Sequence, residues 1–578
     1  MNIVGIVGLC PGLRQNYLSG LDSGIRIFDW LKIGRWELPS SSIVCALNSL
    51  ERVSVQRTQS AACLCLGAVR QTKGLPDQFL SDLDRSDLDG DLHLTFTSGE
   101  DGCSVGTDPL GLFPLYYYST AEFFLFSSSL WPFRRHPRVR AALDVDGLIG
   151  ICLSQGIVGG RTLLQGVTRL SAGHRVAWRP GQLATEHHAN RLRPTADLFN
   201  ATFDEQIDVV DAALRSATAR RNGDLLLLSG GLDSRLVAGY LSATHGPGFP
   251  AISLGSPRHF DVKFAQQVAG RLAWHHRAVD IDVSSFLDHA MVEVRHEQLS
   301  ASFADLSFWQ LVVDLRQSDP ALITGFCGNN VLEPFWDDPR RADFSFAHAF
   351  QACNSYGFRP DTLRRLLRVQ DVDENISAVI ERLREEYESF DCEPFQRVLM
   401  FGLSHRARFH IGAVVSRLAF GVRPLLPYAD QDLLKAALAL PVTAFQARRL
   451  QKTLLCRRFP DLARLPLDTA TFFTRPLMPT FVDRVRHLSL LAYHGLISRE
   501  ERRYYHSMFD LNGAGWRFVR AEAEKSRSKA ESILDRDTLR RLLPPPDEEI
   551  RTGVTDFFKA GSRMKTLLAF MLWSSEHL

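Results

Sequence analysis

The sequence predicts a chain of two parts: an α+β first part over residues 1–195 that is rich in strands, and a second part over residues 205–578 with a doubly wound parallel sheet that continues into helices. In the first part, short β patterns are punctuated by Gly, Pro and Asp. Strands alternate with helices from residue 224 to about residue 322, which is typical of a parallel sheet, and the pattern beyond residue 345 is mostly helical. With 578 residues, the chain can form two or more ordinary domains.

The composition is that of a water-soluble protein. Hydrophobic residues make up 45% and charged residues 23% of the chain, the net charge is only +2, and no basic tract favours nucleic acid as a partner. The ten cysteines include one close pair, Cys63 and Cys65, but no Cys-x-x-Cys, which argues against a disulfide framework and a zinc site. No basic leader region is present, and no apolar run reaches the ~18 residues of a membrane helix. We therefore expect a cytoplasmic protein with no membrane segment.

The elements of the second part can be placed in order. A polar linker leads into a helix that Thr202 or Asp204 caps, and the apolar run over residues 224–228 follows as a strand buried on both faces. The strand of "AISLGS" and the helix of "DVKFAQQVAGRLA" come next. His275 and His276 then fall on a strand, where adjacent side chains point to opposite faces, so we expect a structural role for them rather than a metal site.

The stretch from Ser229 to Ser234, "SGGLDS", joins the first of these strands to a helix and predicts an anion site. Its two glycines let backbone N–H groups turn toward a ligand, and Asp233 and Ser234 open a helix whose N-terminus carries unpaired donors. A tight turn is the plainer interpretation of a bare Ser-Gly-Gly. The chain has neither a Walker A motif nor Gly-x-Gly-x-x-Gly at a strand-to-helix joint, so a different nucleotide loop is implied.

"SGGLDS" matches the pyrophosphate loop of the ATP pyrophosphatase family in full, and its context resembles the synthetase domain of asparagine synthetase and its relatives. The resemblance implies that the loop cradles the β- and γ-phosphates of ATP, that Asp233 helps to hold Mg²⁺, and that the product is an acyl-adenylate. The implied nucleotide-binding residues lie in the loop and at the carboxyl ends of two later strands. They are Ser229, Gly230, Gly231, Asp233, Ser234, Leu254, Gly255 and Gly328.

Three segments of the first part resemble the glutaminase domain of the same family, in the same order. They are "GTDPLGLFPLYYY", from which the family's arginines are missing, "LFSSSLWPFRRHP" and "GIVGGRTLLQGVTRLSAGH". The resemblance covers the chain to about residue 480. It implies an Ntn-hydrolase-like first domain, with a β-sandwich between helices, and an ATP-pyrophosphatase second domain.

The opening residues break the family pattern. A glutamine-hydrolysing relative begins Met-Cys-Gly-Ile-Val-Gly, and its cysteine serves as thiol nucleophile and α-amine base. This chain begins "MNIVGIVG", so Val4 stands in place of the cysteine with three residues before it, and Cys10 lies on the wrong side of the strand. The attacking amine must then belong to the substrate or to another molecule. β-Lactam and carbapenam synthetases and lasso-peptide macrolactam cyclases share this departure.

Other motifs are only partly kept. "TGFCGNNVLEP" resembles the family's Ser-Gly-x-Gly-Gly-Asp-Glu-Leu-Phe-Gly-Gly, and we expect Asn330 to replace the aspartate that is the second Mg²⁺ ligand. The acids Asp337 and Asp338 fit a solvated loop. In "GVRPLLPYADQD", Arg423 replaces a glutamate, whereas Pro427, Tyr428 and Asp430 are kept, with Asp430 expected as a helix N-cap. The metal ligands implied by the resemblance are thus Asp233 and Asn330.

The resemblance also indicates where cationic groups lie. Lys452 matches the start of the family's Lys-x-x-Leu-Arg helix, although a surface position would also explain it. A later lysine of the family, which neutralises phosphate charge, is replaced by Leu477, and Arg475 or Arg235 could supply that charge. The implied catalytic residues are Asp233, Lys452 and Arg475. The last hundred residues are expected to form helices, with no role assigned.

Three functions fit these observations. The first is a lasso-type macrolactam synthetase that adenylates an Asp or Glu side chain of a precursor peptide, with a leader peptidase as a candidate partner. The second is a small-molecule amide ligase of the β-lactam synthetase or ammonia-dependent asparagine synthetase type. The third is a non-catalytic scaffold of the same fold. The intact loop opposes the third, and we rank them in this order.

We predict that the purified protein releases no glutamate from glutamine, because Val4 offers no nucleophile. Val4→Cys should not restore hydrolysis, since the three preceding residues leave the thiol without a terminal amine. A coupled glutamate dehydrogenase assay measures both. Glutamate release by either protein above that of a heat-inactivated sample would contradict the placement of Val4.

Overall fold

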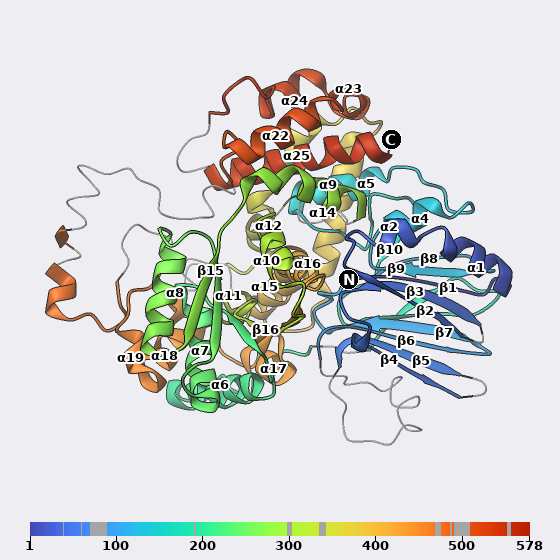
Figure 1. Ribbon diagram of the computed structural model, residues 1–578. Helices are drawn as coiled ribbons and strands as arrows, with labels where there is room; N and C mark the ends of the chain where they lie inside the picture. The colour runs from blue at the N-terminus through green and yellow to red at the C-terminus, as the bar shows by residue number, and fades with distance from the viewer. Residues whose placement is uncertain are drawn as a thin grey trace.

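The computed structural model combines two antiparallel sheets, a parallel sheet and a set of C-terminal helices (Figure 1). It describes residues 1–38, 40–58, 61–69, 90–189, 192–296, 303, 305–333, 343–468, 475–485, 488–489, 509–551 and 557–577. Asp337 and Asp338 therefore lie outside the described residues.

The first part of the chain forms two six-stranded antiparallel sheets, as its β patterns predicted. The first sheet has the order β10 (Thr168–Arg169), β8 (Tyr116–Ser119), β9 (Phe124–Ser127), β1 (Asn2–Val7), β3 (Ser41–Leu47) and β2 (Lys32–Glu37). The second has the order β12 (Thr185–His188), β11 (His174–Trp178), β7 (Gly102–Thr107), β6 (Gly90–Gly99), β5 (Ala62–Val69) and β4 (Val53–Arg57).

The two sheets pack face to face around aromatic side chains. Phe96 of the second sheet stacks on Phe126 of the first, with ring centroids 5.1 Å apart. The opposite face of the first sheet is covered by α1 (Pro11–Ser19), α2 (Asp22–Ile25) and α4 (Trp131–Arg135), which share its hydrophobic core. The outer face of the second sheet is polar, since Arg175 donates hydrogen bonds to Thr95 and Ser104 there. We expected a β-sandwich between two layers of helices. In the part of the chain that the structure describes, helices of the first part cover the outer face of the first sheet only.

Val4 is a core residue of the first sheet. It pairs with Val44 of β3 and Ser127 of β9, and its side chain is fully buried. Its neighbour Ile3 is also paired in the strand, so the residues before Val4 are part of the sheet. Cys10 is exposed at the start of α1. All ten cysteines are free thiols, and the sulfur atoms of Cys63 and Cys65 lie 4.0 Å apart.

The second part contains a five-stranded sheet in which all neighbouring strands are parallel, as predicted. Its order is β15 (His275–Val279), β14 (Pro250–Leu254), β13 (Leu225–Leu227), β16 (Ala321–Thr324) and β17 (Arg423–Leu425). The chain runs outward from β13 through β14 to β15 and then returns to β16 on the other side. This reversal opens a crevice at the carboxyl ends of β13 and β16.

Helices surround this sheet (Figure 1). The first, α6, begins after Thr202, which together with Glu205 forms a capping box, so Thr202 rather than Asp204 is the cap. The helices of the second part are α6 (Phe203–Ala219), α7 (Leu232–His245), α8 (Phe260–Arg271), α9 (Phe286–His296), α10 (Phe308–Leu315), α11 (Gly328–Leu332), α12 (Phe346–Cys353), α13 (Pro360–Leu366), α14 (Val372–Glu388), α15 (Pro394–Gly402), the π-helix η5 (Leu403–Ile411), α16 (Gly412–Leu418), α17 (Gln431–Leu438), α18 (Arg449–Arg458) and α19 (Pro460–Ala463). Helix α5 (Val145–Ser154) belongs to the first part and packs against α14.

The C-terminal helices form a separate layer, drawn in red at the top of Figure 1. They are α22 (Ala514–Glu524), α23 (Arg527–Ala530), α24 (Arg536–Leu542) and α25 (Phe557–His577), and both α22 and α25 pack against α9. Among the described residues, no helix combines the length and the apolar character needed to cross a membrane.

A buried ion-pair network connects the two parts. Arg221, just after α6, pairs with Asp91 of β6 at 2.8 Å and with Asp430 at the start of α17 at 2.9 Å. All three residues are at most 2% exposed. Burial alone would raise the pKa of Asp430, but hydrogen bonds and charge from Arg220 and Arg221 outweigh it and lower that pKa to about 2.

We predict that Arg221→Ala lowers the free energy of unfolding by about 3–5 kcal/mol, because the buried guanidinium that pairs with both Asp91 and Asp430 is lost, although the Arg220 pair with Asp430 is kept. The deficit should shrink as the pH falls from about 4 toward about 2, where Asp430 takes up a proton in the wild type. Urea unfolding at several pH values measures it. Arg364→Ala, which removes exposed pairs with Asp361 and Asp373, is the control and should cost less than about 1 kcal/mol. Equal losses in the two variants would show that the network is not stabilising.

Candidate active site

The loop from Ser229 to Ser234 lies at the carboxyl end of β13, on the crevice between β13 and β16. Its two serines hold its shape. The Ser234 hydroxyl accepts the Ser229 N–H at 3.1 Å and lies 2.8 Å from the Ser229 hydroxyl, which accepts the Gly231 N–H at 3.2 Å. Because α7 begins at Leu232, the loop stands at the N-terminus of a 14-residue helix, which favours an anion.

Glycines allow the elements around the crevice to approach one another. A Cβ on Gly325, which follows β16, would lie 2.7 Å from the Ser234 nitrogen, and one on Gly230 would lie 3.0 Å from the Phe264 Cβ. A Cβ on Gly328 would lie 2.7 Å from Cγ of Asp233. Replacing Gly325 or Gly328 by any larger residue would therefore force the loop to move.

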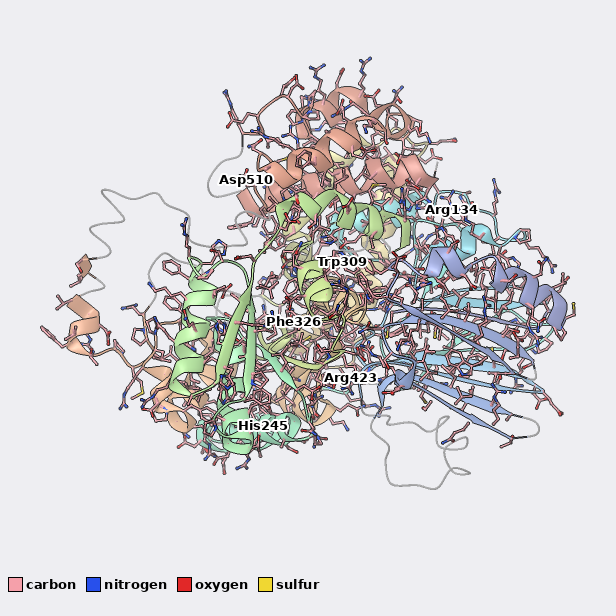
Figure 2. All side chains as sticks on the ribbon, in the orientation of Figure 1. Arg134, His245, Trp309, Phe326, Arg423 and Asp510 are labelled. Carbon is pink, nitrogen blue, oxygen red and sulfur yellow. The ribbon has the colours of Figure 1, made fainter. Side chains whose placement is uncertain are left out.

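A cavity of about 260 Å³ opens beside the loop. Its lining includes Ser229, Gly231, Asp233, Ser234, Leu254, Gly325, Phe326 and Asn329. Leu254 thus lies where the sequence predicted it, at the carboxyl end of β14. Gly255 follows with φ of +114° and donates its N–H to Val279, and it does not line the cavity. Figure 2 labels Phe326 near the centre of the molecule.

The carboxylate of Asp233 is held by two donors from the segment before and within α18. Arg448 pairs with Oδ1 at 2.5 Å, and the Gln451 amide donates to the same oxygen at 2.6 Å. Arg448 also pairs with Glu333 at 2.9 Å. Burial raises the pKa of Asp233, and the Arg448 charge and these hydrogen bonds oppose the shift only in part.

The comparisons with known proteins identify this part of the chain. Residues 208–470 match the family model described as asparagine synthase. This segment is an asparagine synthase domain. Such a domain is an ATP-dependent ligase that forms carbon–nitrogen bonds, so the chain is an enzyme of that type. The resemblance of "SGGLDS" to this family is thereby confirmed for the second part of the chain.

Two solved structures are weakly similar to the chain. Glutamine phosphoribosylpyrophosphate amidotransferase from B. subtilis, complexed with ADP and GMP, is 10% identical over 49% of this chain and 82% of its own, with a TM-score of 0.22. A structure of the allosteric regulatory enzyme of purine biosynthesis is 10% identical over 48% and 80%, with a TM-score of 0.23. These scores are too low to establish a common fold. No curated protein matches the chain.

The role expected of Asn330 as a metal ligand stays a prediction, and its buried Oδ1 has no hydrogen-bond partner in the part of the chain that the structure describes. Asn330 is 2% exposed and does not line the cavity, whereas the preceding residue, Asn329, is exposed and does. Counted from Thr324, the sixth position of the motif, where the family has its aspartate, is Asn329. Adjacent residues on a helix point about 100° apart, so this shift of one residue turns the side chain away from the cavity.

The residues around Asp233 do not fit a magnesium ion. Oδ1 of Asp233 already accepts hydrogen bonds from Arg448 and Gln451. The Arg448 guanidinium also pairs with Glu333, so it occupies the position from which a metal ion would balance both carboxylates. Among the described residues, no cluster of three or more His, Cys, Asp or Glu side chains could hold a metal ion. Mg²⁺ is therefore not assigned to Asp233 in this domain.

The predicted cations have different outcomes. Arg235 is fully buried, and its guanidinium donates to the carbonyls of Gly230, Leu465 and Pro466, so a phosphate-binding role is wrong. Arg235 lies on the buried face of α7, and its hydrogen bond to the Gly230 carbonyl holds the loop in place. Lys452 is exposed on α18 and donates to the Ala447 carbonyl at 2.6 Å.

Arg475 is exposed, and no described contact joins it to the loop. The catalytic roles expected for Asp233, Lys452 and Arg475 stay predictions.

The remaining motif residues support the domain rather than the nucleotide site. Tyr428 donates to the Asp233 carbonyl at 3.2 Å, and Asp430 caps α17 by accepting the Asp432 N–H, as predicted. Arg423 lies at the amino end of β17, far along the sheet from the loop, and Figure 2 labels it. His276 bonds Ser253 at 2.8 Å, which agrees with a structural role for the histidine pair.

Arg448, Gln451, Glu333 and Asn329 were not predicted. Arg448 and Gln451 lie four and one residues before the matched Lys452, so the same motif could have drawn attention to them. Their partner Asp233 is 215 residues away from Arg448 in sequence, and no local pattern pairs the two.

We predict that Ser234→Ala weakens ATP binding about tenfold, because the loss of its hydroxyl leaves the Ser229 N–H without its acceptor and loosens the loop. Ser242→Ala, which removes a hydroxyl from the same helix at a distance from the loop, should bind ATP as the wild type does. Isothermal titration calorimetry measures both affinities. Equal affinities for the two variants would contradict a role of the Ser229–Ser234 loop in nucleotide binding.

Proposed function

We propose that this enzyme activates a carboxylate of its substrate as an acyl-adenylate and that an amine then displaces AMP to form an amide. In the first step, a carboxylate oxygen attacks the α-phosphorus of ATP and pyrophosphate leaves. In the second, the amine nitrogen attacks the acyl carbon, AMP leaves with the bonding electrons, and the nitrogen loses a proton. The observation that carries the proposal is the complete Ser229–Ser234 loop at the carboxyl end of β13, within the asparagine synthase domain.

A series of cavities extends from the loop and supports a peptide as the substrate. Asn329 lines both the nucleotide cavity and a second cavity of about 260 Å³. His405 lines that second cavity and a third of about 720 Å³ between the two parts of the chain. The third cavity draws its lining from both parts, including Leu110, His174, Arg382 and Glu386. Together the cavities offer more room than a small amino acid needs.

His405 is the group that we propose takes up the proton of the amine. It lies on the π-helix η5, an uncommon element that often occurs at functional sites. Its Nε2 lies 3.0 Å from a carboxylate oxygen of Glu386, and its buried Nδ1 has no hydrogen-bond partner in the part of the chain that the structure describes. A histidine oriented by a carboxylate, with its other nitrogen unpartnered, is suited to accept a proton.

The specific reaction that we propose is macrolactam closure of a lasso-type precursor peptide, which joins the peptide's α-amine to an Asp or Glu side chain. Val4 in place of a nucleophilic cysteine supports an amine from the substrate itself. Holding amine and acyl-adenylate together can supply effective molarities on the order of 10⁵ M. The same proposal includes a leader peptidase that exposes the amine. It also includes an Ntn-hydrolase ancestry of the first part and a cytoplasmic location.

A small-molecule amide ligase is the second candidate. The cavity beside the loop has a volume of about 260 Å³, which is smaller than the roughly 300–1,000 Å³ of common ligand sites. A small substrate would need less of the neighbouring cavities than a peptide would. Both candidates use the same adenylation step. They differ in whether the third cavity is needed.

We predict that the enzyme converts ATP to AMP and pyrophosphate with a peptide that carries a free α-amine and an internal Asp or Glu, and that the peptide loses one water on closure. Mass spectrometry and a pyrophosphate assay measure the two products. The N-acetylated peptide should form no ring but should yield a hydroxamate with hydroxylamine, because adenylation does not need the amine. His405→Gln should slow ring closure while leaving the hydroxamate yield unchanged. AMP release only with small carboxylates would favour the second candidate, and no AMP release with either class would favour a scaffold.

A further inference from the structure

Asp233 stands at the position where the resemblance implies a magnesium ligand, yet its charge is already balanced within the chain. Arg448 is the balancing group, and its guanidinium pairs with Asp233 at 2.5 Å and with Glu333 at 2.9 Å. The side chains of Arg448 and Asp233 are 23% and 22% exposed, so water only partly screens the pair. A single guanidinium thus lies between two carboxylates, an arrangement in which a divalent cation is usually found.

The backbone around Arg448 holds the guanidinium in this position. Ala447 and Arg448 are consecutive non-glycine residues in the left-handed region, with φ of 50° and 58°. The Ala447 carbonyl accepts a hydrogen bond from Lys452 Nζ at 2.6 Å, which ties this turn to α18. An uncommon backbone conformation that persists is one that its surroundings hold in place.

Gln451 fixes the orientation of the pair. It is fully buried, its carbonyl oxygen accepts from Nε of Arg448 at 2.8 Å, and its amide nitrogen donates to Oδ1 of Asp233 at 2.6 Å. The three side chains form a closed triangle of hydrogen bonds. Entry of a metal ion at Oδ1 of Asp233 would have to displace the two donors that this oxygen accepts from, Arg448 and Gln451.

We propose that Arg448 replaces the divalent cation at Asp233 and is a positioning residue that keeps the loop ready for a triphosphate without a metal ion held by the protein. The inference rests on the nucleotide site of the proposed function but not on amide formation. If it is right, removal of the guanidinium leaves Asp233 and Glu333 facing one another without counter-charge. The two carboxylates should then attract the divalent cation that the wild type excludes.

Binding of Mn²⁺ alone to the full-length protein, followed by the electron paramagnetic resonance signal of free Mn²⁺, tests this inference. The wild type should show no saturable site in the millimolar range. Arg448→Ala should gain one site, and Arg448→Ala combined with Asp233→Asn should lose it again. Arg449→Ala is the matched control, because Arg449 is the adjacent arginine and lies over the Phe203 ring instead. Arg448→Lys, which keeps the charge, should exclude Mn²⁺ as the wild type does.

Two results would overturn the inference: an Mn²⁺ site in the wild type that Asp233→Asn removes, or no gain of Mn²⁺ by a folded Arg448→Ala. Circular dichroism establishes that the variant is folded. If it is not, the wild type and Arg448→Lys decide by whether they exclude Mn²⁺. These results are independent of catalysis. If the protein excludes Mn²⁺ but forms no amide, the inference is supported and the proposed function is contradicted. If it forms amides with Mn²⁺ bound at Asp233, the proposed function is supported and the inference is contradicted.

Discussion

The buried ion pairs of Arg221 with Asp91 and Asp430 are the constraint on which the arrangement of the two parts depends. Asp91 belongs to an antiparallel sheet, and Asp430 begins α17 beside the parallel sheet. All three side chains are deeply buried, and the Arg221–Asp91 pair joins the first part to the second, so separating the two parts would break it. The first part thus contributes a buried ion pair to the packing of the second.

Docking also sets the geometry of the reaction site. The strand order of the parallel sheet opens the crevice, and the Ser229–Ser234 loop fills one side of it. Arg235 holds the loop by donating a hydrogen bond to the Gly230 carbonyl. Gly325 allows the chain after β16 to approach Ser234 of the loop. The third cavity exists only because the two parts meet, since residues of both line it. Stability and substrate space thus have a common origin.

Local patterns predicted the antiparallel first part, the parallel sheet, the anion loop and the Asp430 cap, because each depends on neighbours in sequence. Contacts between distant segments were beyond such patterns. Arg235 was one of two candidates for a phosphate-binding cation, with Arg475, but helix direction and burial decide where its side chain points. The count along the motif places its aspartate position at Asn329 rather than at Asn330, and on a helix one residue of register changes the face. The Arg448–Asp233 pair joins residues 215 positions apart, and residue type alone does not reveal it.

The residues around the loop carry fewer negative charges than the family motif. Where the family motif has an acidic pair, this chain has Asn329 and Asn330, so two negative charges are absent, one of them at Asn329, which lines the cavity. A site with fewer carboxylates binds a divalent cation more weakly, and it also needs less positive charge for balance. One guanidinium at Asp233 supplies that smaller charge without a metal ion. The proposed role of Arg448 agrees with the amides at Asn329 and Asn330, since removing the arginine alone would leave Asp233 and Glu333 in repulsion.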